Sequence, residues 1–341
     1  MEETFHLRWG ILGTGRIAEG IIRKRPTHTP ANKRTTDIVH LLSGVASSRS
    51  EDVAQEFITA VQAPSYCQAY GDYSDLVNCP TIDVIYIATP HSHHFQNAML
   101  ALEAGKHVLC EKSFTVNAGQ AKKLFTVAKK KQHFLMEGLW TQFLPVRAVI
   151  RVFADNGLGI DPYSDFPPGD RMVVKELAGR ALLDLDVYSI HWVLQAMPKG
   201  NRRPIQILST ATEYPISGVD ETTTILMRFA LSTADGPEIQ AMASASLRAI
   251  TDLDGETAAN LGTISIDKTD LLPDGLYGLC FEADEVAHCI YQGLLESPEM
   301  PWLESLTVME IMDTVRRENN HWFPEEIETL EYPVTLPSKT S

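Results

Sequence analysis

The chain has 341 residues, of which 44% are hydrophobic and 21% charged, and its formal net charge at pH 7 is −15. This length predicts about two domains, and the ordinary composition excludes a disordered, collagen-like or coiled-coil chain. An acidic surface repels phosphate backbones and anionic lipids, so we expect neither nucleic acid nor a membrane as a partner. With no signal-peptide pattern, no long apolar run and five cysteines without C-x-x-C spacing, a cytoplasmic location is expected.

Strands and helices are predicted to alternate through the first half of the chain. Apolar runs predict strands at 7–12, 39–47, 84–88, 107–110 and 134–137, and helical spacing predicts helices at 17–25, 51–61, 94–104 and 118–132. Such alternation is typical of a parallel sheet covered on both faces. We therefore expect residues 1–140 to form a doubly wound Rossmann domain.

The second half has a different pattern. Alternating apolar and polar residues predict strands at 205–214, 222–231 and 238–247, and helices are expected at 184–196, 282–295 and 305–319. This pattern is typical of antiparallel strands with one covered face. Residues 141–341 are therefore predicted to form a second α/β domain with a mostly antiparallel sheet.

A glycine-containing turn, Gly13-Thr14-Gly15-Arg16-Ile17-Ala18, joins the first strand to the first helix. Glycines permit the sharp bend and the close approach of backbone N–H groups to a pyrophosphate, and a small third residue allows helix and strand to pack closely. We expect Gly13, Gly15, Arg16 and Ile17 to bind a dinucleotide, although glycine turns also occur for structural reasons alone.

The second strand is followed by Ser47-Ser48-Arg49-Ser50, without the acidic residue that usually binds the ribose hydroxyls of NAD. A hydroxyl beside a guanidinium suits a 2′-phosphate, so Ser48 and Arg49 predict NADP(H) as cofactor. The alternative is a solvated Arg at the start of a helix. Ser50 is a candidate helix cap.

Two further segments end strands at the carboxyl edge of the predicted sheet, where open α/β folds bind ligands. The first is Thr89-Pro90-His91-Ser92-His93-His94, and the second is Glu111-Lys112. No Cys, Asp or Glu completes a ligand set around the histidines, so we expect no metal and interpret the segment as a loop beside the nicotinamide. Taken alone, Lys112 is most simply a solvated strand-end charge.

Several separated motifs resemble one enzyme family. Residues Ile82–Phe114 (IDVIYIATPHSHHFQNAMLALEAGKHVLCEKSF) resemble the signature region of the glucose-fructose oxidoreductase/inositol dehydrogenase (Gfo/Idh/MocA) family. LMEGLWTQFLP (135–145), GRALLDLDVY (179–188), ADEV (283–286) and MDTVRRE (312–318) resemble its dihydrodiol and D-xylose dehydrogenases. The resemblance implies a Rossmann domain followed by an open-sheet domain. It also implies hydride transfer between NADP(H) and a sugar, cyclic diol or small carbonyl or imine compound, and a homodimer formed through the second sheet.

The resemblance also implies roles for matching positions. Lys112 matches the Lys of the family's Glu-Lys-Pro, beside nicotinamide and substrate, and Tyr188 matches the catalytic Tyr of the subgroup. Asp184 is the acidic residue one helical turn earlier. His94 matches the His of the Pro-Asn-x-x-His loop, with Thr89, Pro90 and Glu111 as further cofactor contacts. Trp140 matches a substrate-pocket Trp.

These residue types suit the oxidation of a hydroxyl, which needs a proton acceptor. A free Tyr has a pKa near 10 and is a poor base at neutral pH, so we expect the Lys112 ammonium to lower the pKa of Tyr188. Asp184 is expected to orient either group. Whether Tyr188 or Lys112 takes the proton stays open, as does the interpretation of Tyr188 as a helix residue at the domain junction.

The chain departs from the family pattern in its second half. Ser113 replaces the Pro of Glu-Lys-Pro, and a cis bond before a non-proline residue costs roughly 2.5–4 kcal/mol, so a trans Lys112–Ser113 bond is predicted. Arg180 and Asp186 replace glycines and are expected to contact substrate, with Asp186 opposing negative charge on Tyr188. The segment 267–279 is short for the family. These departures keep open two alternatives: a non-catalytic NADP-binding regulator, and an enzyme that uses its cofactor for transient oxidation or not at all.

Overall fold

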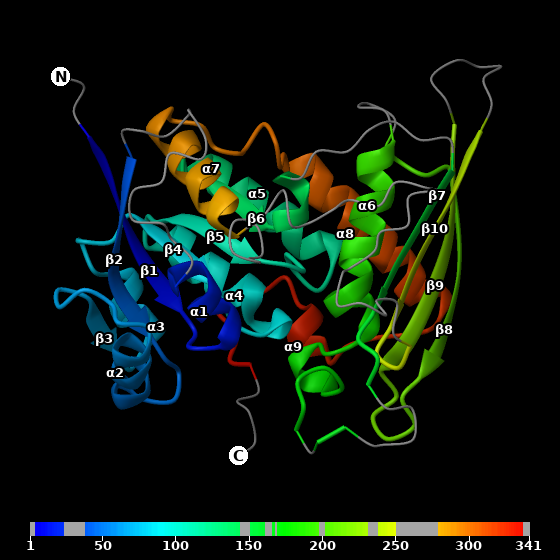
Figure 1. Cartoon of the computed structure of the whole chain (residues 1–341), viewed down its shortest axis with the longest axis horizontal. Coiled ribbons are helices and arrows are strands. Elements are labelled where there is room, and N and C mark those ends of the chain that lie inside the picture. The colour runs from blue at the N-terminus through cyan, green and yellow to red at the C-terminus, as the bar shows by residue number, and fades with distance from the viewer. Residues whose placement is uncertain are drawn as a thin grey trace.

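The computed structural model describes residues 4–23, 38–143, 151–160, 166–167, 169–197, 202–230, 238–249 and 279–336. Two β-sheets stand at opposite sides of the molecule, with helices between them (Figure 1). The predicted short segment 267–279 lies outside the described residues, except for its last residue.

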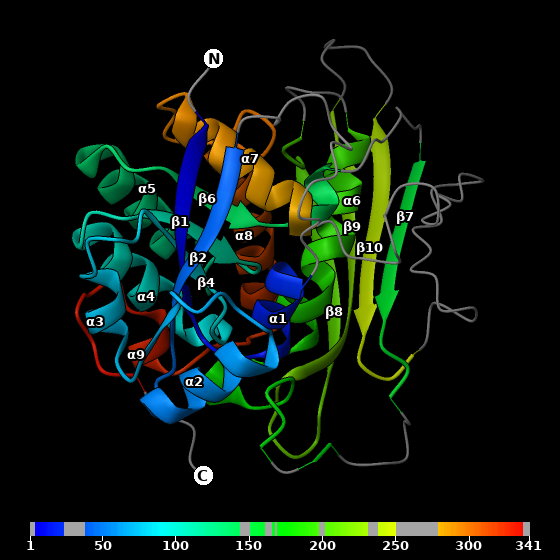
Figure 2. The same cartoon turned by 60° about the vertical axis from the view of Figure 1, so that its left-hand side comes forward.

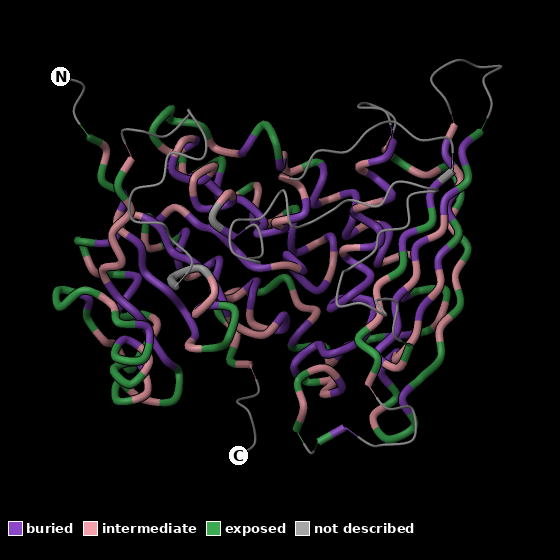
Figure 3. Tube along the Cα trace, in the orientation of Figure 1, coloured by how far each residue is buried: buried purple, intermediate pink, exposed green. Residues whose placement is uncertain are grey.

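The first sheet has six strands in the order β3-β2-β1-β4-β5-β6, and every neighbouring pair is parallel. The strands are β1 Phe5–Leu12, β2 Ile38–Ala46, β3 Gln68–Tyr70, β4 Val84–Ile87, β5 His107–Glu111 and β6 Leu135–Gly138. All four residues of β4 and of β6 are buried, as expected for a sheet covered on both faces (Figure 3). The predicted doubly wound sheet is confirmed, although β3 was not predicted.

The helices of this half are α1 Arg16–Arg23, α2 Glu51–Ala60, α3 Tyr73–Val77, α4 His91–Glu103 and α5 Ala118–Lys131. The Ser50 hydroxyl accepts a hydrogen bond from the Val53 amide (3.3 Å), which confirms the predicted cap of α2. One prediction was wrong: α4 begins at His91, so the histidine-rich segment is the first helical turn and not a loop. The fixed φ of Pro90 and its position directly before the helix explain the earlier start.

The second sheet is mixed, with four strands in the order β7-β10-β9-β8. They are β7 Arg151–Gly157, β8 Gln206–Glu213, β9 Asp220–Phe229 and β10 Ile239–Ser246. β9 is antiparallel to β8 and β10, as predicted, whereas β7, which was not predicted, runs parallel to β10. Helices α6 Val187–Ala196 and α8 Trp302–Glu318 lie on the inner side of the sheet, and no described element covers the outer face (Figure 2).

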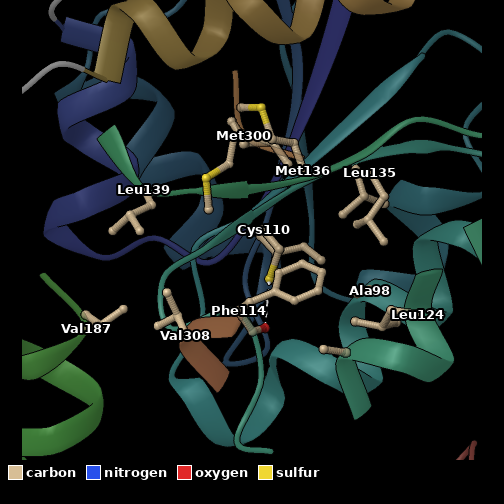
Figure 4. Close-up of a cluster of buried hydrophobic side chains, with 14 of the residues drawn as sticks. Ala98, Cys110, Phe114, Leu124, Leu135, Met136, Leu139, Val187, Met300 and Val308 are labelled. Carbon is tan, nitrogen blue, oxygen red and sulfur yellow. Dashed lines mark hydrogen bonds between the residues drawn. The ribbon is translucent and has the colours of Figure 1, made fainter. Parts of the chain in front are cut away.

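The last helices return to the first sheet. Helix α7, Leu279–Tyr291, contacts α1 and β6, and the Trp302 indole donates to the Leu135 carbonyl (2.9 Å). The short helix α9, Glu325–Glu328, follows α8. One core therefore joins both halves: Val187 of α6 and Val308 of α8 belong to the same cluster as Cys110 and Leu135 (Figure 4). The division into 1–140 and 141–341 stays a prediction.

Within the described residues, no helix is long and apolar enough to cross a membrane.

Candidate active site

The turn after β1 has the geometry that a dinucleotide pyrophosphate requires. Gly13 has φ +103°, and a Cβ there would lie 2.7 Å from the Ala88 carbonyl oxygen, so only glycine fits. A Cβ on Gly15 would meet no atom within 4 Å, which leaves space in front of the start of α1. Ala18 is fully buried against the sheet, and Arg16 and Ile17 are exposed beside it. These residues fit a bound dinucleotide.

Ser48 and Arg49 are exposed at the end of β2, directly before α2. The Ser47 hydroxyl accepts a hydrogen bond from the Arg49 amide (3.2 Å), which fixes the backbone of this turn. A hydroxyl and a guanidinium are thus presented together at the carboxyl edge of the sheet, which suits the 2′-phosphate of NADP.

His94 links two segments at this edge. Its Nδ1 lies 2.8 Å from the Ser113 carbonyl oxygen, and its Nε2 lies 2.8 Å from the Thr89 carbonyl oxygen. The Asn97 amide also donates to the Thr89 hydroxyl (3.1 Å). The turn between β4 and α4, which includes Pro90, is thereby tied to the segment that follows β5.

The predicted trans bond between Lys112 and Ser113 is wrong, because the structure has a cis peptide there. Ser113 is fully buried, and its hydroxyl donates to the Leu183 carbonyl (2.8 Å) while its own carbonyl faces His94. The prediction considered only the intrinsic preference of the peptide bond, whereas both of these Ser113 contacts are with residues that lie elsewhere in the chain.

Asp184 is the centre of a cluster formed where the two halves of the chain meet. Lys112 Nζ donates to the Asp184 carbonyl (2.9 Å) and lies 4.0 Å from the carboxylate oxygen Oδ1. Arg171 Nη1 donates to the same Oδ1 (2.7 Å), and His91 Nε2 lies 3.8 Å from it. We call Asp184, Lys112, Arg171 and His91 the Asp184 cluster. The structure places Asp184 beside Lys112, and its expected role in orienting Lys112 or Tyr188 stays a prediction.

The electrostatics of the Asp184 cluster favour an ionised carboxylate and an amine that gives up its proton readily. Burial alone would raise the pKa of Asp184, but His91, Arg171 and Lys112 together lower it. Burial lowers the pKa of His91 to about 3, so this imidazole is neutral at pH 7. Burial also lowers the pKa of Lys112, and the Asp184 carboxylate only partly offsets that effect. Lys112 is therefore closer to a functional base than a free Lys.

Tyr188 does not have the predicted lowered pKa. Lys112 Nζ lies over its ring, 4.9 Å from the centroid. Burial raises the pKa of Tyr188, and the nearby Glu111, Glu282 and Asp184 carboxyls raise it further, outweighing a hydrogen bond with Trp140. The prediction of a phenolate stabilised by Lys112 is thus wrong for this arrangement. The carboxyls that oppose negative charge on Tyr188 are therefore Glu111, Glu282 and Asp184, whereas Asp186 was the residue expected in this role.

Asp184 lies in a single π-helical turn, Leu182–Asp186 (η3), that opens α6. Such turns interrupt the α-helical pattern and occur often at functional sites. Here the carbonyls of Leu183 and Asp184 accept hydrogen bonds from the side chains of Ser113 and Lys112. The predicted relation between Asp184 and Tyr188, one regular helical turn apart, is therefore modified by this turn.

Arg180 and Asp186, expected at the substrate, lie elsewhere. The Arg180 side chain is 1% exposed, pairs with Asp220 (3.3 Å) and stacks on Phe323 (4.0 Å from its ring centroid). Asp186 is fully buried; burial and the nearby Asp220 and Asp155 raise its pKa. The structure thus corrects the expectation of substrate contact, because both side chains are sealed beneath the second sheet in what we call the Asp220 cluster (Arg180, Asp186 and Asp220).

Two further buried carboxyls lie near Tyr188. Glu111 accepts a hydrogen bond from the Tyr86 hydroxyl, and Glu282 of α7 has no partner for either oxygen among the described residues. Burial raises the pKa of both groups. The Glu111 carboxyl is thus hydrogen-bonded to Tyr86, and its expected contact with the cofactor stays a prediction.

Sequence reasoning missed Arg171, His91 and Glu282 as members of the site. His91 lies in the histidine-rich segment, directly after Pro90. A proline at this position is a signal for the start of a helix, and the first turn of that helix would face the edge of the sheet. Glu282 directly precedes the quoted ADEV motif. Arg171 lies in a turn without periodicity, and no local signal marks it. Among the described residues, no group of three or more His, Cys, Asp or Glu is placed to hold a metal ion.

Comparisons with known proteins agree with this geometry. Residues 7–139 match the model of an oxidoreductase family with an NAD-binding Rossmann fold. The chain is 35% identical to a D-xylose 1-dehydrogenase (NADP(+)) of Hypocrea jecorina, covering 98% of each chain. It is 31% identical to a trans-1,2-dihydrobenzene-1,2-diol dehydrogenase of Danio rerio, covering 92% of this chain and 96% of the relative.

A levoglucosan dehydrogenase solved with NADH and levoglucosan shares the fold, with a TM-score of 0.70 at 16% identity over 92% of this chain and 97% of that one. The Hypocrea jecorina alignment has more positions than this chain has residues, so that relative has segments without a counterpart here. From the family match and the near-complete alignments, the chain belongs to the Gfo/Idh/MocA family of oxidoreductases.

Proposed function

We propose that this protein is an NADP(H)-dependent oxidoreductase acting on a C–OH group of a sugar or cyclic diol, with Lys112 as the proton-transfer residue. The observation that carries the proposal is the Asp184 cluster: a largely buried Lys112 amine, held by the Asp184 carbonyl (2.9 Å), at the same sheet edge as the glycine turn. The name of the Hypocrea jecorina relative supports both NADP and an aldose substrate.

The proposed roles follow from the contacts described. Gly13, Gly15 and the start of α1 hold the pyrophosphate, and Ser48 and Arg49 hold the 2′-phosphate. When bound, NADP⁺ supplies the acceptor for the hydride that leaves the substrate carbon. The Lys112 amine takes the hydroxyl proton and becomes an ammonium, which the Asp184 carboxylate stabilises.

Tyr188 and Trp140 are proposed to form the wall of the substrate pocket. Their rings lie 6.2 Å apart between centroids and are both partly exposed. A raised pKa keeps the Tyr188 hydroxyl protonated, so it serves as a hydrogen-bond donor to substrate and not as the base.

The test is nicotinamide absorbance with the purified chain, NADP⁺ or NAD⁺, and aldoses or trans-diols. Turnover that prefers NADP⁺ is expected, and Arg49→Gln should lower the ratio of kcat/KM for NADP⁺ to that for NAD⁺ by about tenfold or more. Tight NADPH binding without turnover of any substrate would instead support the regulator alternative. The buried positions of Arg180 and Asp186 remove the argument that favoured that alternative.

A homodimer through the open sheet is also proposed. On the face that no described element covers, one register row across all four strands consists of Leu208, Leu226, Met242 and Phe153, and Leu208 and Leu226 are 55% and 52% exposed. Apolar patches of this kind mark interfaces. Leu226→Glu should give a monomer in sedimentation experiments, whereas Leu303→Glu, at an exposed leucine of α8, should not. A wild-type monomer at micromolar concentration would contradict the proposal.

We also propose a location in the reducing cytoplasm, which the free state of the described cysteines 67, 79, 110 and 289 supports.

A further inference from the structure

Arg171 is the only half-exposed member of the Asp184 cluster. Its side chain is 50% exposed, whereas those of Lys112, His91 and Asp184 are 14%, 5% and 0% exposed. Because Arg171 and Lys112 face the same oxygen of Asp184, the guanidinium is a direct neighbour of the amine that would accept the substrate proton. It therefore lies between the buried reacting groups and the solvent.

The position of Arg171 is fixed by its backbone. The Asp170 carboxylate accepts a hydrogen bond from the Met172 amide (2.9 Å) in a tight turn. A Cβ on Gly179 would lie 1.8 Å from the Arg171 carbonyl oxygen, so the two segments pack as closely as a glycine permits. Gly179 directly precedes the stretch that leads into the π-helical turn with Asp184. The turn that carries Arg171 is thus part of the framework of the site.

The guanidinium has hydrogen-bonding capacity that the described residues do not use. It has five N–H donors in a planar fork, and Nη1 donates to Asp184. The only acceptor among the described residues is that carboxylate, which leaves the edge formed by Nε and Nη2 open. A guanidinium edge of this kind matches the two oxygens of a carboxylate or phosphate.

The charge balance of the reaction favours an anion at this place. In the proposed reaction Lys112 starts as a neutral amine, and the Arg171 cation then balances the one negative charge of Asp184. When Lys112 takes the hydroxyl proton, the cluster gains a positive charge in a largely buried site. A negative substituent of the substrate at Arg171 would stabilise that state.

We propose that Arg171 is a specificity-determining residue that binds an anionic substituent, carboxylate or phosphate, close to the reacting hydroxyl, so that the substrate is an acidic derivative of a sugar or related polyol. The kinetic test of this proposal rests on the proposed hydride transfer, whereas its binding test does not require turnover.

The experiment compares D-glucose, D-glucuronate and D-glucose 6-phosphate, which share the ring and the C1 hydroxyl and differ only in the group on C5. For the wild-type chain with NADP⁺, at least one anion should exceed glucose in kcat/KM by about tenfold or more, with a KM that rises with KCl. The two anions distinguish a carboxylate from a phosphate site.

Variants of Arg171 separate binding from a merely structural role. Arg171→Gln should lower the ratio of kcat/KM for the anion to that for glucose by about tenfold or more. Arg171→Lys should lower this ratio less, because lysine keeps the positive charge but lacks the paired N–H donors of the guanidinium. Arg203→Gln is the matched control: its guanidinium is 60% exposed and pairs with Glu310 (3.2 Å), and the ratio should not change. An equal loss for all three sugars in Arg171→Gln, or a wild type that prefers glucose, would overturn the proposal.

If no sugar is turned over, the same set is compared by binding to the NADP⁺ complex, followed by tryptophan fluorescence. Tighter binding of an anion that disappears in Arg171→Gln supports the site although the proposed activity has failed. Equal binding of the anions and glucose by the wild type rejects the site.

Discussion

The stretch 180–186 contributes charged side chains to two clusters with opposite properties. In the Asp184 cluster, a carboxylate faces two basic side chains, and Arg171 connects it with the solvent. In the Asp220 cluster, Arg180 and Asp220 pair at 3.3 Å with side chains 1% and 0% exposed, and the two Asp186 oxygens have no partner among the described residues.

The surroundings shift the pKa values of the two aspartates of this stretch in opposite directions. Neighbouring basic groups lower the pKa of Asp184 against the effect of burial, whereas burial and two further carboxyls raise the pKa of Asp186. Identical side chains thus acquire different roles from their surroundings. We infer that the first cluster serves the reaction and the second holds the π-helical turn in place, a difference that mutations can test.

The largest effect is expected from Lys112→Met. Loss of the proton acceptor should lower kcat/KM by roughly 10²–10⁴-fold, because this is the usual contribution of a general base. NADPH affinity and the free energy of unfolding should change little. Lys122→Met, at a 57% exposed side chain of α5, serves as the control. Activity that survives in Lys112→Met would assign proton transfer to another group.

Asp220→Ala should affect stability instead. It leaves the buried Arg180 guanidinium without its carboxylate and the Leu182 amide without its acceptor (2.7 Å), so we expect a loss of about 3–5 kcal/mol in the free energy of unfolding, measured with urea. Glu238→Ala removes a pair with Arg228 in which both side chains are more than 40% exposed, and should cost less than about 1 kcal/mol. Equal losses would mean that the Asp220 cluster has no special structural role.

Some parts of the fold and of the site could be predicted from the sequence. The glycine turn was predictable because its function requires a backbone conformation that one residue type provides, as at Gly13. Alternating apolar strands likewise predicted the parallel sheet, since its strands are buried on both faces. Both features are local in the sequence.

Features that depend on distant partners were not predictable. Arg180 and Asp186 were expected to contact substrate because they replace glycines of the family pattern, but the sequence does not show where their side chains point. In the structure both lie near Asp220, which is more than 30 residues further along the chain. The contacts of Ser113 with Leu183 and His94, and that of Arg171 with Asp184, likewise join residues that no local pattern brings together. Strand β7 was missed because its parallel partner, β10, lies far away in sequence.

The pH dependence of catalysis should separate the effects that two neighbouring charged groups have on the pKa of Lys112. The Asp184 carboxylate raises the pKa of Lys112 and Arg171 lowers it. As a base, Lys112 must be unprotonated, so kcat/KM should increase with pH through this pKa. Asp184→Asn should move this increase to lower pH, and Arg171→Gln should move it to higher pH. Shifts in the same direction would show that these residues do not act through the charge on Lys112.

The smallest effect concerns Asp186 and the pH dependence of stability. Its pKa is raised in the folded chain, while in the unfolded chain it is near the ordinary value of about 3.9, so above that pH the folded state holds more protons. Asp186 should therefore make the wild type lose stability as the pH rises, by at most about 1.4 kcal/mol per pH unit. Asp186→Asn cannot titrate, so its advantage over the wild type should grow from pH 4 upwards, whereas Glu326→Gln, an exposed control, should follow the wild type in parallel. Parallel curves for Asp186→Asn as well would mean that this carboxyl is ionised in the fold and that the two aspartates do not differ.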